Sequence, residues 1–160
     1  MRRPIIVGNW KMNMLISTAD EWMKMLLSKP LIDSVDIVVA PPFTLLAVVH
    51  EWSMGSGIQL AGQNMGSEQG GARTGEISAA MLKDAGCDYV ILGHSERRQY
   101  LAETDELIKR KITVACDHGL NVVFCIGESL DERKNGLTNG VVESQLSVGL
   151  ADMDALKLSR

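Results

Sequence analysis

Residues 89–98 read YVILGHSERR, and this stretch decides the fold. Its first four residues are apolar and rich in β-branched types, without the polar alternation of a half-solvated strand, so they predict a strand covered on both faces. The glycine and histidine that follow lead into a charged segment, which predicts a turn into a helix. A buried strand that passes directly into a helix indicates one β–α unit of a parallel sheet.

Similar apolar runs lie elsewhere in the chain, at residues 5–8, 35–40, 58–61 and 122–126. Helical patterns separate them. We expect a first helix capped by Ser17 or Thr18, with Glu21 completing a capping box, and stopped by Pro30. Further helices are expected at residues 43–52, 78–85, 104–116 and 140–150. The order is β–α repeated about five times, which predicts an α/β fold with a parallel sheet in a single domain, residues 1–160.

Two parallel architectures fit this order. An open doubly wound sheet would be complete at this length, whereas a closed (β/α)8 barrel needs about 250 residues. The first apolar run leads into residues 8–13, GNWKMN, which lack the glycine fingerprint that binds a dinucleotide phosphate after the first strand. This disfavours a dinucleotide-binding sheet and leaves other open sheets as alternatives.

The composition argues against several function classes. The formal net charge is −4, whereas nucleic-acid-binding domains usually carry a basic surplus. The three cysteines are odd in number and form no CxxC pair, so we expect no disulfide framework, no zinc site and a reducing, cytoplasmic location. The N-terminal apolar run breaks at Asn9, too early for a signal peptide, and no stretch approaches the roughly 18 apolar residues of a membrane span.

Polar residues follow the first and fourth apolar runs, at the strand ends where parallel α/β folds gather their functional groups. Lys11 offers a fixed positive charge for a phosphate or an oxyanion, and Glu96 is a candidate partner for it. His94 precedes a helix, whose positive end favours a neutral imidazole that donates a hydrogen bond to a carbonyl oxygen. Ser95 is the expected N-cap of that helix. The pattern predicts an α/β enzyme that acts on a small anion.

Each of these residues also has an ordinary structural interpretation. A lone histidine after a strand, such as His94, is more often structural than catalytic. Lys11 would more often be a solvated surface charge, and Asn9 is a common turn residue. The residue pattern alone therefore leaves both interpretations open.

Six motifs together are more specific than this pattern. Residues 8–13 (GNWKMN) and 89–98 (YVILGHSERR) resemble the two N-terminal signatures of the triosephosphate isomerase family. Further motifs match the same family in the same order, at residues 40–43 (APPF), 62–64 (GQN), 75–78 (GEIS) and 125–128 (CIGE). The resemblance covers essentially the whole chain, and it implies the (β/α)8 TIM-barrel fold, truncated to about five parallel βα units.

The resemblance also implies an activity and the residues that perform it. The family interconverts dihydroxyacetone phosphate and D-glyceraldehyde 3-phosphate, a step of glycolysis and gluconeogenesis, through an enediolate and without a metal or organic cofactor. Asn9 and Lys11 would bind the substrate, and His94 would be the neutral electrophile that moves protons between the two substrate oxygens. Glu96 corresponds to the acid beside the lysine, and Ser95 opens the helix that supports His94.

Members of the family are dimers, and residues 64–78 correspond to the loop by which each subunit enters a pocket of its neighbour. Gln63 and Asn64 stand at the start of this loop, and Thr74 matches the residue that reaches towards Asn9 of the partner subunit. The resemblance thus implies a homodimer that binds a small phosphorylated triose and neither nucleic acid nor membrane. Without the resemblance, the loop would be interpreted as a mobile surface excursion.

The sequence departs from the family pattern towards its end. The family's next strand carries a Tyr-Glu-Pro-Val-Trp motif whose Glu is the catalytic base, and this motif does not occur by Arg160. We therefore expect a chain that is inactive alone and, with two unpaired strand edges, is not a stable monomer. The alternatives are a non-catalytic, self-associating barrel module with at most weak phosphate binding, and a different sugar-phosphate enzyme on the same barrel.

Overall fold

The computed structural model describes residues 3–159, so Met1, Arg2 and Arg160, at the two ends of the predicted domain, lie outside the described residues. Within this range, one five-stranded sheet has the order β1-β2-β3-β4-β5, and every neighbouring pair is parallel. The strands are β1 (Ile5–Asn9), β2 (Asp36–Ala40), β3 (Gln59–Gly62), β4 (Cys87–Leu92) and β5 (Asn121–Phe124). The predicted parallel α/β order is confirmed, and each predicted run overlaps one strand.

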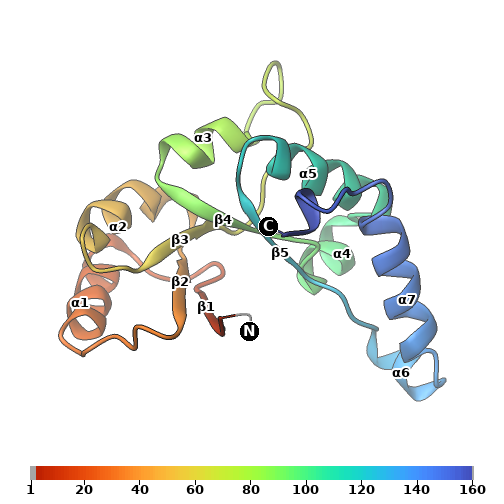
Figure 1. Ribbon diagram of the computed structural model, residues 1–160, viewed down its shortest axis with the longest axis horizontal. Helices are drawn as coiled ribbons and strands as arrows, with labels where there is room; N and C mark the ends of the chain where they lie inside the picture. The colour runs from red at the N-terminus through yellow and green to blue at the C-terminus, as the bar shows by residue number, and fades with distance from the viewer. Residues whose placement is uncertain (1–2, 160) are drawn as a thin grey trace.

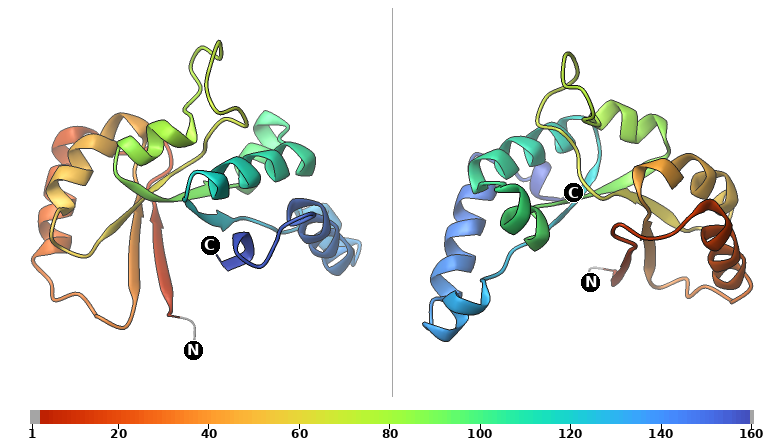
Figure 2. Two further views of the ribbon diagram at one scale, coloured as in Figure 1. Left: turned by 45° about the horizontal axis from the view of Figure 1, so that its top comes forward. Right: turned by 180° about the vertical axis from the view of Figure 1, so that it is seen from behind.

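Helices connect successive strands and lie along the outer side of the curled sheet (Figure 1 and Figure 2). They are α1 (Ile16–Leu27), η1 (Phe43–Leu45) with α2 (Leu46–Ser53), α3 (Ala79–Asp84), α4 (Ser95–Leu101) with α5 (Asp105–Asp117), α6 (Leu130–Lys134) with α7 (Thr138–Gly149), and η2 (Lys157–Ser159). The five parallel βα units form a curled half-barrel, as a truncated barrel requires.

Apolar side chains cover both faces of the central strands. On the helix side, Leu60 and Leu92 of the sheet share a buried cluster with Leu82 and Ile108 of the helices. On the opposite side, strand residues form a second cluster whose buried members are Val38, Ala40, Ala61 and Ile91. Because successive residues of a strand point to opposite faces, burial on both sides requires the unbroken apolar runs seen in the sequence.

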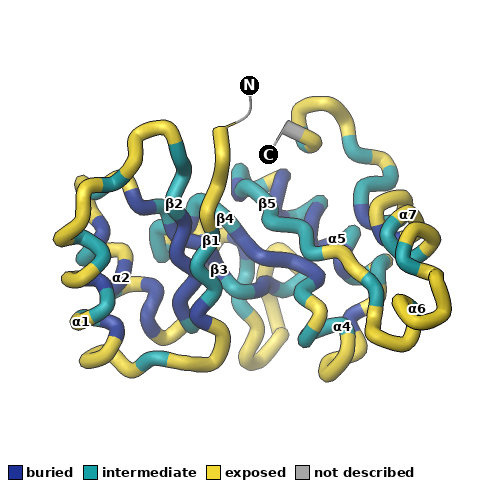
Figure 3. The backbone as a smooth tube through the Cα atoms, turned by 90° about the horizontal axis from the view of Figure 1, so that it is seen from below, coloured by how far each residue is buried: buried dark blue, intermediate teal, exposed yellow. Residues whose placement is uncertain are grey.

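The two edge strands are less buried than the central ones (Figure 3). No residue of β1 or β5 is fully buried, whereas the last three residues of β2 and of β4 are. Ile5 and Ile6 on β1 are 44% and 63% exposed. Among the described residues, each edge strand pairs on one side alone, which leaves its outer backbone groups open to another strand.

Two helix starts differ from the sequence predictions. The first helix begins at Ile16 with Leu15 as its N-cap, so the prediction that Ser17 or Thr18 caps it with help from Glu21 is wrong. The Thr18 hydroxyl instead lies inside the first turn, where it accepts a hydrogen bond from the Leu15 N–H at 3.0 Å. The last long helix begins at residue 138 rather than 140, and α6 has no counterpart in the sequence prediction.

Candidate active site

The C-terminal ends of β1, β3 and β4 meet around a cavity of about 310 Å³. Asn9 and Lys11 border it from the end of β1, and His94 and Glu96 border it from the end of β4. Residues that follow β3, the Arg97 and Tyr100 side chains of α4, and apolar side chains complete its wall. The structure therefore brings together four of the residues that the sequence analysis singles out, although Lys11 and Glu96 are 85 positions apart in the chain.

Lys11 lies at the centre of the polar contacts in this cavity. Its Nζ donates a hydrogen bond to the Glu96 Oε1 at 2.6 Å, and its backbone N–H donates to the Asn9 Oδ1 at 2.9 Å. The hydrogen bond from the lysine side chain lowers the pKa of the Glu96 carboxyl below its ordinary value. Glu96 therefore stays ionised at neutral pH, and it is a weak proton acceptor.

His94 is the N-cap of α4, and its ring turns back onto the helix that it precedes. The Nδ1 atom accepts a hydrogen bond from the Glu96 N–H at 3.3 Å, which requires a lone pair on that nitrogen. The neutral tautomer with its proton on Nε2 meets this requirement, and Nε2–H is then a donor for a carbonyl oxygen. Ser95 is the first helical residue, so its predicted N-cap role is wrong, because the histidine occupies the cap position.

The turn before His94 is fixed from two sides. Gly93 has φ = 74°, and a Cβ atom there would lie 3.0 Å from the Cys125 carbonyl oxygen, so the position favours glycine. Arg98 donates from Nε to the Gly93 carbonyl at 2.7 Å and from its guanidinium to the Cys125 carbonyl at 3.2 Å, and it pairs with Asp105. Arg98 thus ties the ends of β4 and β5 together beside the histidine, a role that the sequence analysis missed.

Comparison with known proteins decides the family. The family model described as triosephosphate isomerase matches residues 4–160. The chain belongs to the triosephosphate isomerase family. The triosephosphate isomerase of Carboxydothermus hydrogenoformans is 51% identical over 156 residues, which are 97% of this chain and 62% of that protein. Those of Endomicrobium trichonymphae and Prosthecochloris aestuarii are 47% and 48% identical, over 96% and 94% of this chain and 62% and 60% of the relatives.

The curated triosephosphate isomerases are longer than this chain, which spans 60–62% of the length of these relatives. The resemblance found in the signature motifs is confirmed. The half-barrel is accordingly that of a truncated TIM barrel.

The loop at residues 64–78, which the family resemblance assigns to the subunit contact, protrudes from the sheet between β3 and α3 (Figure 2). Its base is closed by the Gly66 N–H, which donates to the Ile77 carbonyl at 2.8 Å. Thr74 is exposed on this loop and does not border the Lys11 cavity of its own chain. Its approach to Asn9 of the partner subunit stays a prediction.

Gln63 and Asn64 make contacts within their own chain. The Gln63 Nε2 donates to the Lys11 carbonyl at 2.9 Å and to the Ala40 carbonyl at 2.8 Å. The buried Asn64 Oδ1 accepts a hydrogen bond from the Lys111 Nζ at 2.9 Å. The sequence analysis placed both amides at the start of the subunit loop, and it missed these contacts because they depend on which segments approach β3.

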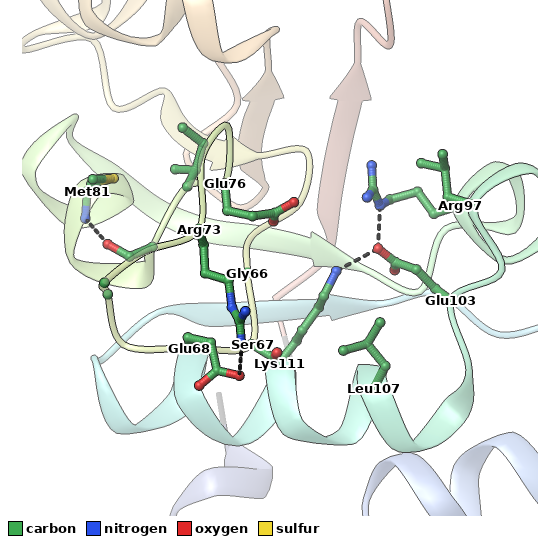
Figure 4. A pocket seen from close by; sticks show the side chains of 15 residues that line it. Gly66, Ser67, Glu68, Arg73, Glu76, Met81, Arg97, Glu103, Leu107 and Lys111 are labelled. Atoms are coloured by element: carbon green, nitrogen blue, oxygen red, sulfur yellow. Dashed lines mark hydrogen bonds and ion pairs between the residues drawn. The ribbon is translucent and has the colours of Figure 1, made fainter.

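Lys111 also forms a second lysine–glutamate pair, with Glu103, on the wall of a larger cavity of about 450 Å³ (Figure 4). The Lys111 Nζ donates to the Glu103 Oε1 at 2.6 Å, and the Arg97 Nε donates to the same oxygen at 2.7 Å. Burial alone would raise the pKa of Glu103, but the hydrogen bonds from Lys111 and Arg97 outweigh it and lower that pKa. No residue in the described range hydrogen-bonds to Glu103 Oε2.

Residues 3–159 were also compared with the requirements of a metal site, a membrane-spanning helix and a reactive thiol. In this range no three His, Cys, Asp or Glu side chains are grouped so that they could hold a metal ion. None of the helices described here is both long and apolar enough to span a membrane. Burial raises the pKa of the Cys87 thiol to about 12, so this thiol is protonated and a poor nucleophile at neutral pH.

Proposed function

We propose that this chain carries the substrate-binding and electrophilic part of a triosephosphate isomerase site, which interconverts dihydroxyacetone phosphate and D-glyceraldehyde 3-phosphate through an enediolate. The observation that carries the proposal is the meeting of Asn9, Lys11 and His94 at one cavity of about 310 Å³. That volume lies within the range of small-ligand sites. The reaction moves protons alone, so the proposal includes no metal or organic cofactor.

Lys11 supplies the positive charge that an anionic substrate needs. Its ion pair with Glu96 is about half exposed, so a phosphate or an enediolate oxygen can approach the ammonium group from the solvent side. The Asn9 Oδ1 is engaged by the Lys11 N–H, which leaves the Asn9 amide NH2 group as its donor towards a ligand. Donors that are in place before charge develops stabilise the transition state without further reorganisation.

His94 acts on the substrate oxygens. Its neutral ring would donate from Nε2 to a carbonyl oxygen and polarise the adjacent carbon–hydrogen bond for proton removal. The same ring would then pass protons between the two oxygens of the enediolate. The role proposed here uses the tautomer with its proton on Nε2, because Nδ1 accepts the hydrogen bond from the Glu96 N–H.

The proton on carbon needs a base from elsewhere. Glu96 is the carboxylate that borders the cavity, and the hydrogen bond from Lys11 lowers its pKa. We assign the base to the Glu of the family's Tyr-Glu-Pro-Val-Trp motif, which is not among these 160 residues. Because a general base typically contributes about 10²–10⁴ in rate, we expect no isomerase activity from the chain alone in a coupled assay.

We also propose that residues 64–78 join two copies into a homodimer in the cytoplasm. The exposed loop supports the dimer, and the odd number of cysteines without a CxxC pair supports a reducing compartment. The alternative is a self-associating module without catalysis, which the exposed Ile5 and Ile6 on edge strand β1 favour. Ile6→Lys would disperse assemblies built through this edge and leave a dimer built through the loop intact, as sedimentation velocity would record.

The test of the proposed site is a calorimetric titration with dihydroxyacetone phosphate. Lys11→Met removes the charge at similar length, and we expect affinity to fall about 10- to 100-fold, because hydrogen bonds to charged groups are the stronger class. Lys134→Met, on α6 and outside the cavity, is the matched control and should bind like the unmodified chain. Equal affinity of Lys11→Met and the unmodified chain, or no binding by the unmodified chain, would contradict the proposal.

A further inference from the structure

The backbone of Lys11 adopts a conformation that lysine rarely takes. Its φ of 53° lies in the left-handed region, where the Cβ atom of an L-residue is crowded by the backbone. Such a residue persists only where its surroundings hold it, and these positions cluster at functional sites. The contacts around the Lys11 backbone therefore bear on where its ammonium group lies.

Two side-chain amides hold this backbone, one on each side. The Asn9 Oδ1 accepts from the Lys11 N–H at 2.9 Å, and the Gln63 Nε2 donates to the Lys11 carbonyl at 2.9 Å. The same Gln63 nitrogen donates to the Ala40 carbonyl at 2.8 Å. That carbonyl also accepts from the Trp10 N–H at 3.0 Å. Gln63 thus links the end of β3 to the end of β2 and to the turn that carries Lys11.

We propose that Gln63 is a positioning residue for the Lys11 charge, an inference that rests on the proposed function. An amide NH2 group has two hydrogens, and here each faces one backbone carbonyl, so the donor capacity of Gln63 matches its surroundings. A carboxylate at the same place would have no donor and would face two carbonyl oxygens. The adjacent Asn64 binds Lys111 instead, so the two neighbouring amides hold different parts of the fold.

Three variants separate positioning from general stability. Gln63→Met keeps the length of the side chain and removes both hydrogens, and Gln63→Glu places an anion against the two carbonyls. Gln59→Met is the matched control, because Gln59 is a half-buried glutamine that begins β3, the strand that Gln63 follows, at the end away from the cavity. Far-UV circular dichroism would check that each variant folds.

The first readout is the conformation of Lys11 itself, measured by nuclear magnetic resonance. In both Gln63 variants, the Lys11 Cα and Cβ shifts and its HN–Hα coupling should leave their left-handed values, whereas Gln59→Met should preserve them. In the unmodified chain, the Gln63 side-chain amide protons should exchange with solvent more slowly than those of Gln59. Equal exchange rates, or unchanged Lys11 signals in Gln63→Met, would overturn the proposal without reference to any ligand.

The second readout is the titration with dihydroxyacetone phosphate. Loss of the two amide hydrogen bonds should weaken binding by Gln63→Met about tenfold, and Gln59→Met should bind like the unmodified chain. Lys11 signals that move without a change in affinity would overturn the positioning role. Failure of the unmodified chain to bind would refute the proposed function, while the exchange and shift data would still decide whether Gln63 holds Lys11.

Discussion

Two lysine–glutamate pairs in this chain share an Nζ–Oε1 distance of 2.6 Å in opposite surroundings. The side chains of Lys11 and Glu96 are 50% and 45% exposed, whereas those of Lys111 and Glu103 are 4% exposed each. Water screens the charges of an exposed pair, and a ligand can compete for them. A buried charge destabilises the fold unless its partner compensates it. Distance alone therefore does not give the role of a pair. The exposed pair is open to a ligand, and the buried pair holds α5 against the segment before it.

The largest effect is expected from breaking the buried pair. Glu103→Gln leaves the Lys111 ammonium without its anionic partner, and removing one member of a buried pair costs about 3–5 kcal/mol. Because Asn64 continues to accept from Lys111, we expect the lower end of this range. Urea unfolding followed by circular dichroism measures the change. A loss well under about 1 kcal/mol would show that the pair behaves as an exposed one does.

The second-largest effect is expected in the pH dependence of stability, which should reveal the contribution of the buried Glu103. The folded-state pKa of Glu103 lies below its ordinary value of 4.5, so its contribution is present above pH 4.5 and is lost as the pH falls through the lowered pKa. The free energy of unfolding of the unmodified chain should thus decline more steeply below pH 4.5 than that of Glu103→Gln. Parallel declines in the two proteins would rule out Glu103 as the source.

The smallest effect on stability is expected at the exposed pair. Glu96→Gln removes the anion beside Lys11, but solvent already screens both charges, so the urea midpoint should stay within experimental error. The same variant should change the affinity for dihydroxyacetone phosphate, because Lys11 loses its partner. A midpoint shift as large as that of Glu103→Gln would remove the distinction between the pairs.

The strands could be predicted from the sequence because burial on both faces of the sheet requires unbroken apolar runs. Val90 and Ile91 are neighbours in one apolar run and pack in different clusters, one on each side of the sheet. Cap residues were predicted less evenly. Thr104, the first residue of the helix expected at residues 104–116, is the N-cap of α5, whereas His94 rather than Ser95 is the N-cap of α4. The start of α6 carries a capping box of Ser129 and Glu132 that the sequence displays and the prediction overlooked.

The sequence predicted the part of the candidate site that lies directly after the strands. Lys11 and His94 meet because parallel strands place their carboxyl ends on one rim. The contact of Gln63 with the turn after β1 joins segments 52 positions apart, and that of Lys111 on α5 with Asn64 joins segments 47 positions apart. No periodicity or motif in the sequence encodes how these segments approach each other, so the supporting contacts became visible only in three dimensions.

The most direct test of the account is the state of the His94 ring beside Lys11 during a titration with dihydroxyacetone phosphate. Nitrogen-15 shifts of the imidazole at neutral pH should report a neutral ring with its proton on Nε2, and the Nε2 signal should move as the ligand binds. Lys11→Met should show the same free-state shifts and a much weaker response. A doubly protonated ring, a proton on Nδ1, or a ring that does not respond to saturating ligand would contradict the account.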